Sequence, residues 1–66
     1  MSQRKTKFSN DEAIDVWLRH WSGQSGDDIA YDYRINAGRV SEVLNEKRNV
    51  GSKHAASRIW KQRTIA

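Results

Sequence analysis

Apolar residues recur near the start of the chain at spacings of three, one and three, which places them on one face of a helix. They are Ile14, Trp17, Leu18 and Trp21. Ser9 and Glu12 form the S-x-x-E pattern of a capping box, and Phe8 stands where a hydrophobic staple begins. The pattern predicts a helix over residues 10–21, which Gly23 ends.

Two shorter amphipathic stretches follow. Ser25 is a suitable N-cap for the first, because Asp27 and Asp28 then fall in the first turn, where the helix dipole favours carboxylates. The residues expected to face inward are Ile29, Ala30 and Tyr33. Asn36 is a suitable N-cap for the second stretch, whose expected inward residues are Val40, Val43 and Leu44. The two predicted helices lie near residues 26–33 and 37–45.

A fourth helical pattern comes after residues 45–51, which are polar, without periodicity, and predict a loop. Ser52 is again a capping residue, and a helix near residues 53–63 would have an apolar side and a basic side. The apolar residues are Ala55, Ala56, Ile59 and Trp60. The residues largely on the other side are Lys53, His54, Arg58, Lys61 and Arg63.

No stretch alternates with period two for long enough to form a strand, so the sequence predicts an all-α fold. A chain of 66 residues has the size of one small domain. We expect a compact three- to four-helix domain over residues 8–63, preceded by a flexible basic arm at residues 1–7. Residues 64–66 are also expected to be disordered.

The net charge of +4 is distributed unevenly. Residues 1–7 carry +3, residues 8–33 carry −5, and residues 34–66 carry +6. The tail and the C-terminal half therefore suit a polyanionic partner, with the acidic segment turned to water. An ordinary solvated surface is the alternative interpretation.

The composition narrows the class of protein. Apolar residues make up 36% of the chain without a long run, so we expect no membrane association. The basic start lacks the apolar core of a signal peptide and cysteine is absent, so we expect an intracellular protein of the bacterial cytoplasm or nucleoid. His20 and His54 lie on different predicted helices, and no serine has a base at a suitable spacing. We expect no metal or other cofactor, no small-molecule ligand and no enzyme activity.

Residues 26–45 read GDDIAYDYRINAGRVSEVLN, two short helical patterns joined by about three residues, which is the geometry of a helix-turn-helix. Ala30 is small where the two helices would cross, and Ile35 would fill the corner beneath the turn. With the apolar residues of the second helix inward, its opposite face projects outward. The outward residues are Ala37, Gly38, Ser41, Glu42 and Asn45.

This stretch resembles the helix-turn-helix superfamily of bacterial and phage regulators, and RVSEVLN at residues 39–45 is most similar to lactose-repressor-like and resolvase-like modules. The resemblance implies base contacts by Ala37, Gly38 and Glu42, phosphate contacts by Ser41 and Asn45, and an Asn36 cap close to the DNA backbone. It departs from the family at Arg34, where glycine is usual. A left-handed turn there costs a non-glycine residue on the order of 1 kcal/mol. Either the turn is locally different, or Arg34 offsets this cost by reaching a phosphate.

The candidate DNA contacts fall into two groups. The base-contacting candidates are Asn36, Ala37, Gly38, Arg39 and Glu42. The phosphate-contacting candidates are Arg34, Ser41, Asn45, Lys47, Arg48 and Lys53. For Glu42 two interpretations stay open: it accepts from the amino group of cytosine, or it forms a salt bridge to Arg39. The N-terminal residues Arg4, Lys5 and Lys7 either form a DNA-contacting arm or serve solubility.

The sequence thus predicts a sequence-specific regulator of double-stranded DNA, a repressor of phage or mobile-element type. A homodimer is expected, with Ile59 and Trp60 as an exposed apolar patch at its interface. One alternative is a protein-interaction module that binds polymerase or a recombinase. Another is an architectural protein with little sequence preference.

Overall fold

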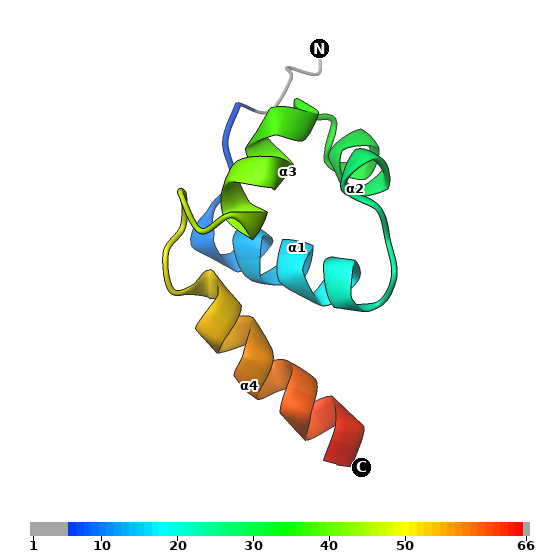
Figure 1. The fold of residues 1–66 in the computed structure, drawn as a ribbon, viewed down its shortest axis with the longest axis vertical. Coiled ribbons are helices and arrows are strands. Elements are labelled where there is room, and N and C mark those ends of the chain that lie inside the picture. The colour runs from blue at the N-terminus through cyan, green and yellow to red at the C-terminus, as the bar shows by residue number, and fades with distance from the viewer. Residues whose placement is uncertain (1–5, 66) are drawn as a thin grey trace.

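The computed structural model describes residues 6–65, with side chains described through residue 63. This part of the chain forms four helices and no strand, which confirms the all-α prediction. The helices are α1 (Asn10–Trp21), α2 (Gly26–Tyr33), α3 (Ala37–Leu44) and α4 (Ser52–Ile65). In Figure 1, α2 and α3 lie on one side of α1, and α4 lies on the other side and projects beyond the rest. Among these helices, α4 packs only against α1.

The ends of α1 are set by local hydrogen bonds. The Ser9 hydroxyl accepts from the backbone N–H of Glu12, and the Glu12 carboxylate accepts from the backbone N–H of Ser9, which completes the predicted capping box. At the other end Gly23 adopts a φ of +102°. The backbone N–H of Gln24 then donates to the carbonyl of Arg19, so α1 closes with a Schellman motif.

The predicted caps of α2 and α3 are also present. The side chain of Ser25 accepts from the backbone N–H of Asp28, and that of Asn36 accepts from the backbone N–H of Gly38. The predicted end of α3 is one residue too long, because Asn45 caps the helix rather than continuing it. Glu46 then takes up the left-handed conformation that reverses the chain.

The predicted start of α4 needs a correction. Ser52 is the first residue of the helix, and its hydroxyl accepts a buried hydrogen bond of 3.2 Å from the Trp17 indole instead of capping. The carbonyl of Gly51 accepts the first helical hydrogen bond, from the backbone N–H of Ala55, so Gly51 rather than Ser52 stands at the cap position. At the other end, α4 continues to Ile65. Residues 64 and 65 are therefore helical rather than disordered, because neither glycine nor proline interrupts the helix. The prediction for residues 1–5 and 66 lies outside the described residues.

The core collects one apolar side chain or more from every helix. The buried members are Phe8, Ala13, Val16, Trp17, Ile29, Ala30, Ile35, Val40, Val43 and Ala56. Ala13 and Val16 were not on the predicted inward stripe of α1, whereas Ile14 and Leu18 are only half-buried. The difference arises because α1 is covered on two sides, by α2 and α3 and by α4, so its buried face is wider than one stripe.

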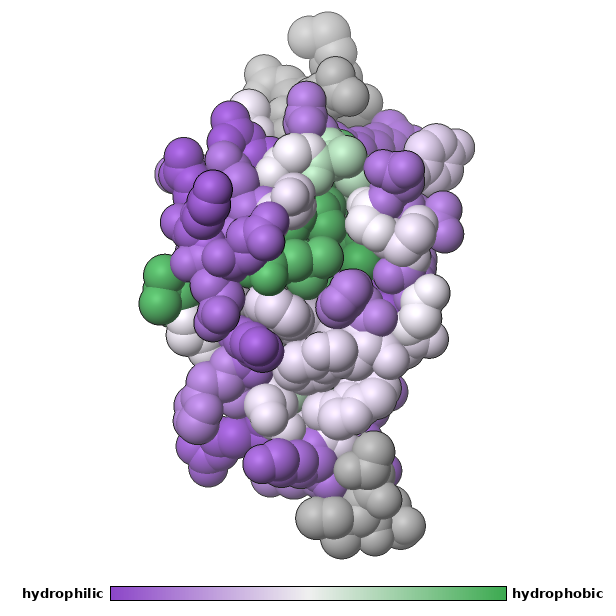
Figure 2. Space-filling model, in the orientation of Figure 1, coloured by the Kyte–Doolittle hydropathy of each residue, from purple (hydrophilic) through white to green (hydrophobic). Residues whose placement is uncertain are grey.

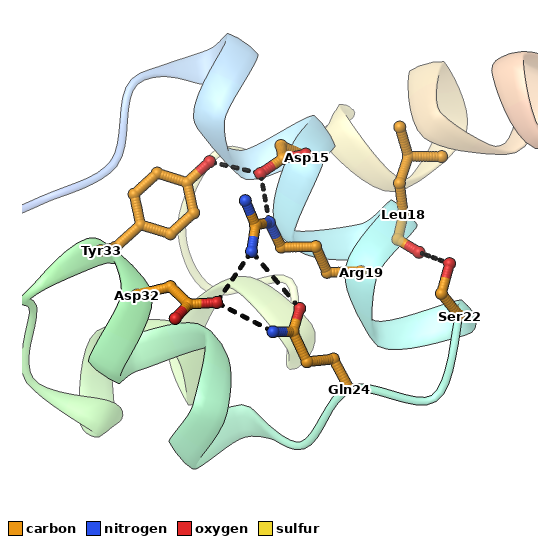
Figure 3. Close-up of polar contacts among 7 residues, drawn as sticks. All are labelled: Asp15, Leu18, Arg19, Ser22, Gln24, Asp32 and Tyr33. Atoms are coloured by element: carbon orange, nitrogen blue, oxygen red, sulfur yellow. Dashed lines mark hydrogen bonds and ion pairs between the residues drawn. The ribbon is translucent and has the colours of Figure 1, made fainter.

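A polar cluster fixes α2 against α1 (Figure 3). Arg19 donates to Asp15 at 2.7 Å and to Asp32 at 3.0 Å, and Gln24 also donates to Asp32. The Tyr33 hydroxyl donates a hydrogen bond to the same Asp15 carboxylate. Burial alone would raise the pKa of Asp15, but the hydrogen bonds from Tyr33 and Arg19 outweigh it and lower that pKa below its ordinary 3.8. Burial and the bond to Asp15 raise the pKa of Tyr33.

Candidate nucleic-acid interface

Helix α3 turns one apolar edge to the core and leaves the rest at the surface. Val40 and Val43 are buried and Leu44 is half-buried, as the sequence predicts. The three residues between α2 and α3 include Arg34, whose φ of 55° is the left-handed conformation expected at that position. Ile35 is buried beneath this turn. The connection therefore holds α3 across the end of α2 with its outward face exposed.

The first two residues of α3 expose little more than backbone. Ala37 and Gly38 are both exposed, and the Asn36 side-chain oxygen accepts from the backbone N–H of Gly38 at 2.7 Å. A Cβ at Gly38 would lie 3.1 Å from that oxygen, so glycine leaves room for the cap. Asn36 thus holds the helix start, and the surface beside it is unobstructed by long side chains.

The next turn of the outward face carries a linked pair of small polar side chains. The Asn45 amide donates to the Ser41 carbonyl at 2.8 Å and to the Ser41 hydroxyl at 3.1 Å. Both residues are exposed. The two phosphate-contacting candidates on α3 therefore stand together in one restrained arrangement.

Glu42 pairs with two arginines. Its Oε1 atom lies 3.0 Å from a terminal guanidinium nitrogen of Arg39 and 3.7 Å from Nε of Arg48. The salt bridge to Arg39, one of the two interpretations of Glu42, is present, and the contact with Arg48 had no signal in the spacing of the sequence. A single carboxylate therefore ties α3 to the basic loop that follows it.

A cavity of about 220 Å³ lies next to this cluster, between the N-terminal segment, α3 and the loop. Lys7 lines it together with Arg39, Glu42 and Arg48. Its position brings one residue of the predicted basic arm to the same surface as the two arginines. The other basic residues of that arm, Arg4 and Lys5, lie outside the described residues.

The loop after α3 is held by Asn49, which was not among the predicted site residues. Asn49 donates to the backbone carbonyl of Phe8 at 3.4 Å and to the side chain of Asn10 at 2.8 Å. Its φ of 53° is a conformation that asparagine tolerates better than most residues. An asparagine within a polar loop is therefore the signal in the sequence that could have identified it. These bonds position the exposed Lys47 and Arg48 beside α3.

Lys53, the last phosphate-contacting candidate, is exposed at the start of α4. Its ammonium lies 5.4 Å from the centre of the Trp17 ring, a distance at which a cation–π interaction forms. Arg34 is exposed at the opposite end of α3. Arg34 thus precedes α3, Lys47 and Arg48 follow it and Lys53 is on α4, while Ser41 lies on α3 itself.

A shallow groove separates the start of α2 from the outward face of α3. Small and apolar residues line most of it, among them Gly26, Ala37, Val40 and Leu44. In Figure 2 apolar surface is visible between α2 and α3, with hydrophilic residues around it. Asp27 also lines the groove. The acidic segment therefore reaches the edge of this face and is not turned wholly away from it.

The predicted apolar patch on α4 is smaller than expected. Trp60 is half-buried, because its ring packs against Trp21 with centroids 5.8 Å apart. Ile59 remains 38% exposed. Two other apolar side chains are far more exposed, Tyr31 at 83% and Val50 at 79%, and the sequence analysis singled out neither.

None of the helices that the structure describes combines the length and the apolar character that a membrane crossing requires. Within the described residues, no three histidine or carboxylate side chains come together as a metal site would need. No protein-family model matches the chain, and no curated protein or solved structure matches it.

Proposed function

We propose that this chain binds double-stranded DNA through a helix-turn-helix formed by α2 and α3, with α3 in the major groove. The supporting observation is the asymmetry of α3. Its residues Val40 and Val43 are buried, while the opposite face is exposed and carries mostly short or polar side chains. An α-helix with its side chains is about 10–12 Å in diameter and fits a major groove about 12 Å wide.

In this proposal few side chains contact bases. The Ala37 methyl group can meet a thymine methyl, Gly38 lets the backbone approach closely, and Glu42 can accept from the amino group of cytosine. Arg39 supplies the guanidinium for a guanine, a contact worth about 1–3 kcal/mol. Because the set is small, the shape of the DNA contributes to specificity as well.

Residues on α3 and on the segments before and after it contact phosphates and fix its orientation. They are Arg34, Ser41, Asn45, Lys47, Arg48 and Lys53. Since each phosphate neutralised by a lysine or an arginine contributes about 0.9 to the salt dependence, the four cations of this set give a log–log slope of roughly −4 on the cognate site.

We further propose that the protein represses transcription by occluding its site and that it belongs to a bacterial phage or mobile element. A two-fold dimer matches half-sites one helical turn apart. Ile59, with the half-buried Trp60 beside it, forms the seam. Sedimentation equilibrium of the protein, alone and bound to DNA, tests the dimer. A mass of one chain at every concentration in both samples refutes the proposed dimer.

The test of DNA binding is a titration against genomic fragments from around the gene, with excess competitor DNA, at two salt concentrations. Retention on one fragment supports specific recognition. Uniform binding that salt abolishes supports an architectural protein of low specificity instead. An absence of binding at the lower salt concentration refutes both.

A second candidate function is protein interaction through the outward face of α2. Tyr31 is 83% exposed there, and Asp27 and Asp28, one turn earlier, are exposed as well. An exposed tyrosine beside carboxylates fits a basic protein surface, such as one on polymerase or a recombinase. Tyr31→Ala should then reduce regulation in a reporter assay while binding to DNA is unchanged. A loss of DNA binding would contradict this assignment.

A further inference from the structure

We infer that Glu42 determines specificity by holding Arg39 and Arg48 away from backbone phosphates until the cognate sequence engages its carboxylate. The inference rests on the proposed DNA binding. It concerns what happens to the charge of this surface when the protein meets DNA of the wrong sequence.

The geometry makes Glu42 a shared partner. One oxygen, Oε1, lies 3.0 Å from the Arg39 guanidinium and 3.7 Å from the Arg48 guanidinium. Arg39 comes from α3 and Arg48 from the loop, so the carboxylate controls cations on two different segments. Among the described residues that line the adjacent cavity it is also the single acidic one, and Lys7 is the third cation there.

These ion pairs have little to do with stability. All three side chains are partly exposed, and such pairs contribute about 0–1 kcal/mol to folding. Their effect on a polyanion is larger. A phosphate must compete with the carboxylate for the same guanidinium groups, and the carboxylate repels it directly.

A cytosine in the right position changes this balance. Glu42 accepts from its amino group, and the two arginines are then released toward a guanine or a phosphate. On random DNA this exchange does not occur. Random DNA is therefore held by the cations outside the cluster, and the cognate site by those cations together with both arginines.

The test compares Glu42→Gln with a matched control, Glu46→Gln. Both variants raise the net charge by one, and the two positions are four residues apart. Glu46 is exposed and forms no ion pair among the described residues. Binding to a random 20-base-pair duplex is measured by fluorescence anisotropy at a series of NaCl concentrations, and thermal melts establish that both variants are folded.

On random DNA we expect a log–log slope of about −3 for the wild type, from Arg34, Lys47 and Lys53, and of about −5 for Glu42→Gln. Since a regained contact is worth close to tenfold at 0.1 M salt, affinity should rise by about tenfold to a hundredfold. Glu46→Gln should leave the slope unchanged. Adding Arg48→Ala to Glu42→Gln should remove one unit of the gained slope, whereas Arg48→Ala alone should have little effect on random DNA.

If the wild type binds DNA and the two glutamine variants change the salt slope and the affinity equally, the inference about Glu42 is overturned and the proposed function stands. An unchanged slope in Glu42→Gln has the same consequence. A wild type and a Glu42→Gln variant that both fail to bind any duplex at the lowest salt refute the proposed function, and the inference with it.

Discussion

Replacing Arg34 by glycine should stabilise the fold and weaken binding to DNA at the same time. Arg34 closes α2 in the left-handed conformation, with φ 55° and ψ 48°. That conformation brings Cβ close to the following carbonyl oxygen and costs a non-glycine residue about 1–2 kcal/mol. Glycine removes this cost but loses about 0.4–1 kcal/mol of chain entropy on folding. The net gain is therefore about 0.5–1 kcal/mol.

For a domain of this size, 1 kcal/mol corresponds to a change of about 4–8 °C in the melting temperature. Thermal unfolding followed by circular dichroism should thus show an increase of about 2–8 °C for Arg34→Gly. If Arg34 contacts a phosphate, the same variant loses about 0.9 from the magnitude of the salt slope on the cognate site. Affinity falls although the protein is more stable.

Glu46→Gly is the matched control, because Glu46 ends α3 with a φ of 59°. It should raise the melting temperature by a similar amount, and it should not weaken DNA binding. A lower melting temperature in both variants would show that the left-handed conformation carries no relievable strain. An unchanged salt slope in Arg34→Gly would remove Arg34 from the phosphate contacts.

Two further predictions concern the fold. Ser52→Ala leaves the buried indole N–H of Trp17 without its acceptor and should cost about 1–3 kcal/mol in chemical denaturation, and a loss below 0.5 kcal/mol would contradict this role. The pKa of Asp15 is lower in the folded state than its ordinary 3.8. Its contribution to stability is therefore fully present above pH 3.8 and disappears as the pH falls through the pKa of the folded state. Asp15→Asn should therefore flatten that part of the pH–stability curve, and an unchanged acid limb would assign the effect to other carboxylates.

The helix starts were predictable because their signals are local. Ser9, Ser25 and Asn36 each accept from a backbone N–H two or three residues further on, and the chemistry of such a bond is visible in the sequence. The buried side of α3 was predictable for a similar reason, since its apolar spacing has the period of the helix. These signals survive because nothing distant competes with them.

The failures involve partners that are far apart in sequence. Ser52 is a residue type typical of a cap, but its hydroxyl accepts instead from the indole of Trp17, which lies 35 residues away in the sequence. Trp60 was expected at the surface because a small core has limited room. It is instead half-buried against Trp21, at the edge of the contact between α1 and α4. Spacing along the chain contains no information about either encounter.

The arrangement of charge around α3 shows why the net charge is a poor guide to DNA affinity. Arg39 and Arg48 share Glu42, and Lys53 lies over the Trp17 ring. Of the basic candidates, Arg34, Lys47 and Lys53 form no ion pair among the described residues. The surface that a random duplex meets is therefore much less basic than the C-terminal half of the sequence suggests. If α3 binds DNA as proposed, Arg39 and Arg48 become available only where a base gives Glu42 another partner. Affinity for the correct site and discrimination against other sites then depend on the same three side chains.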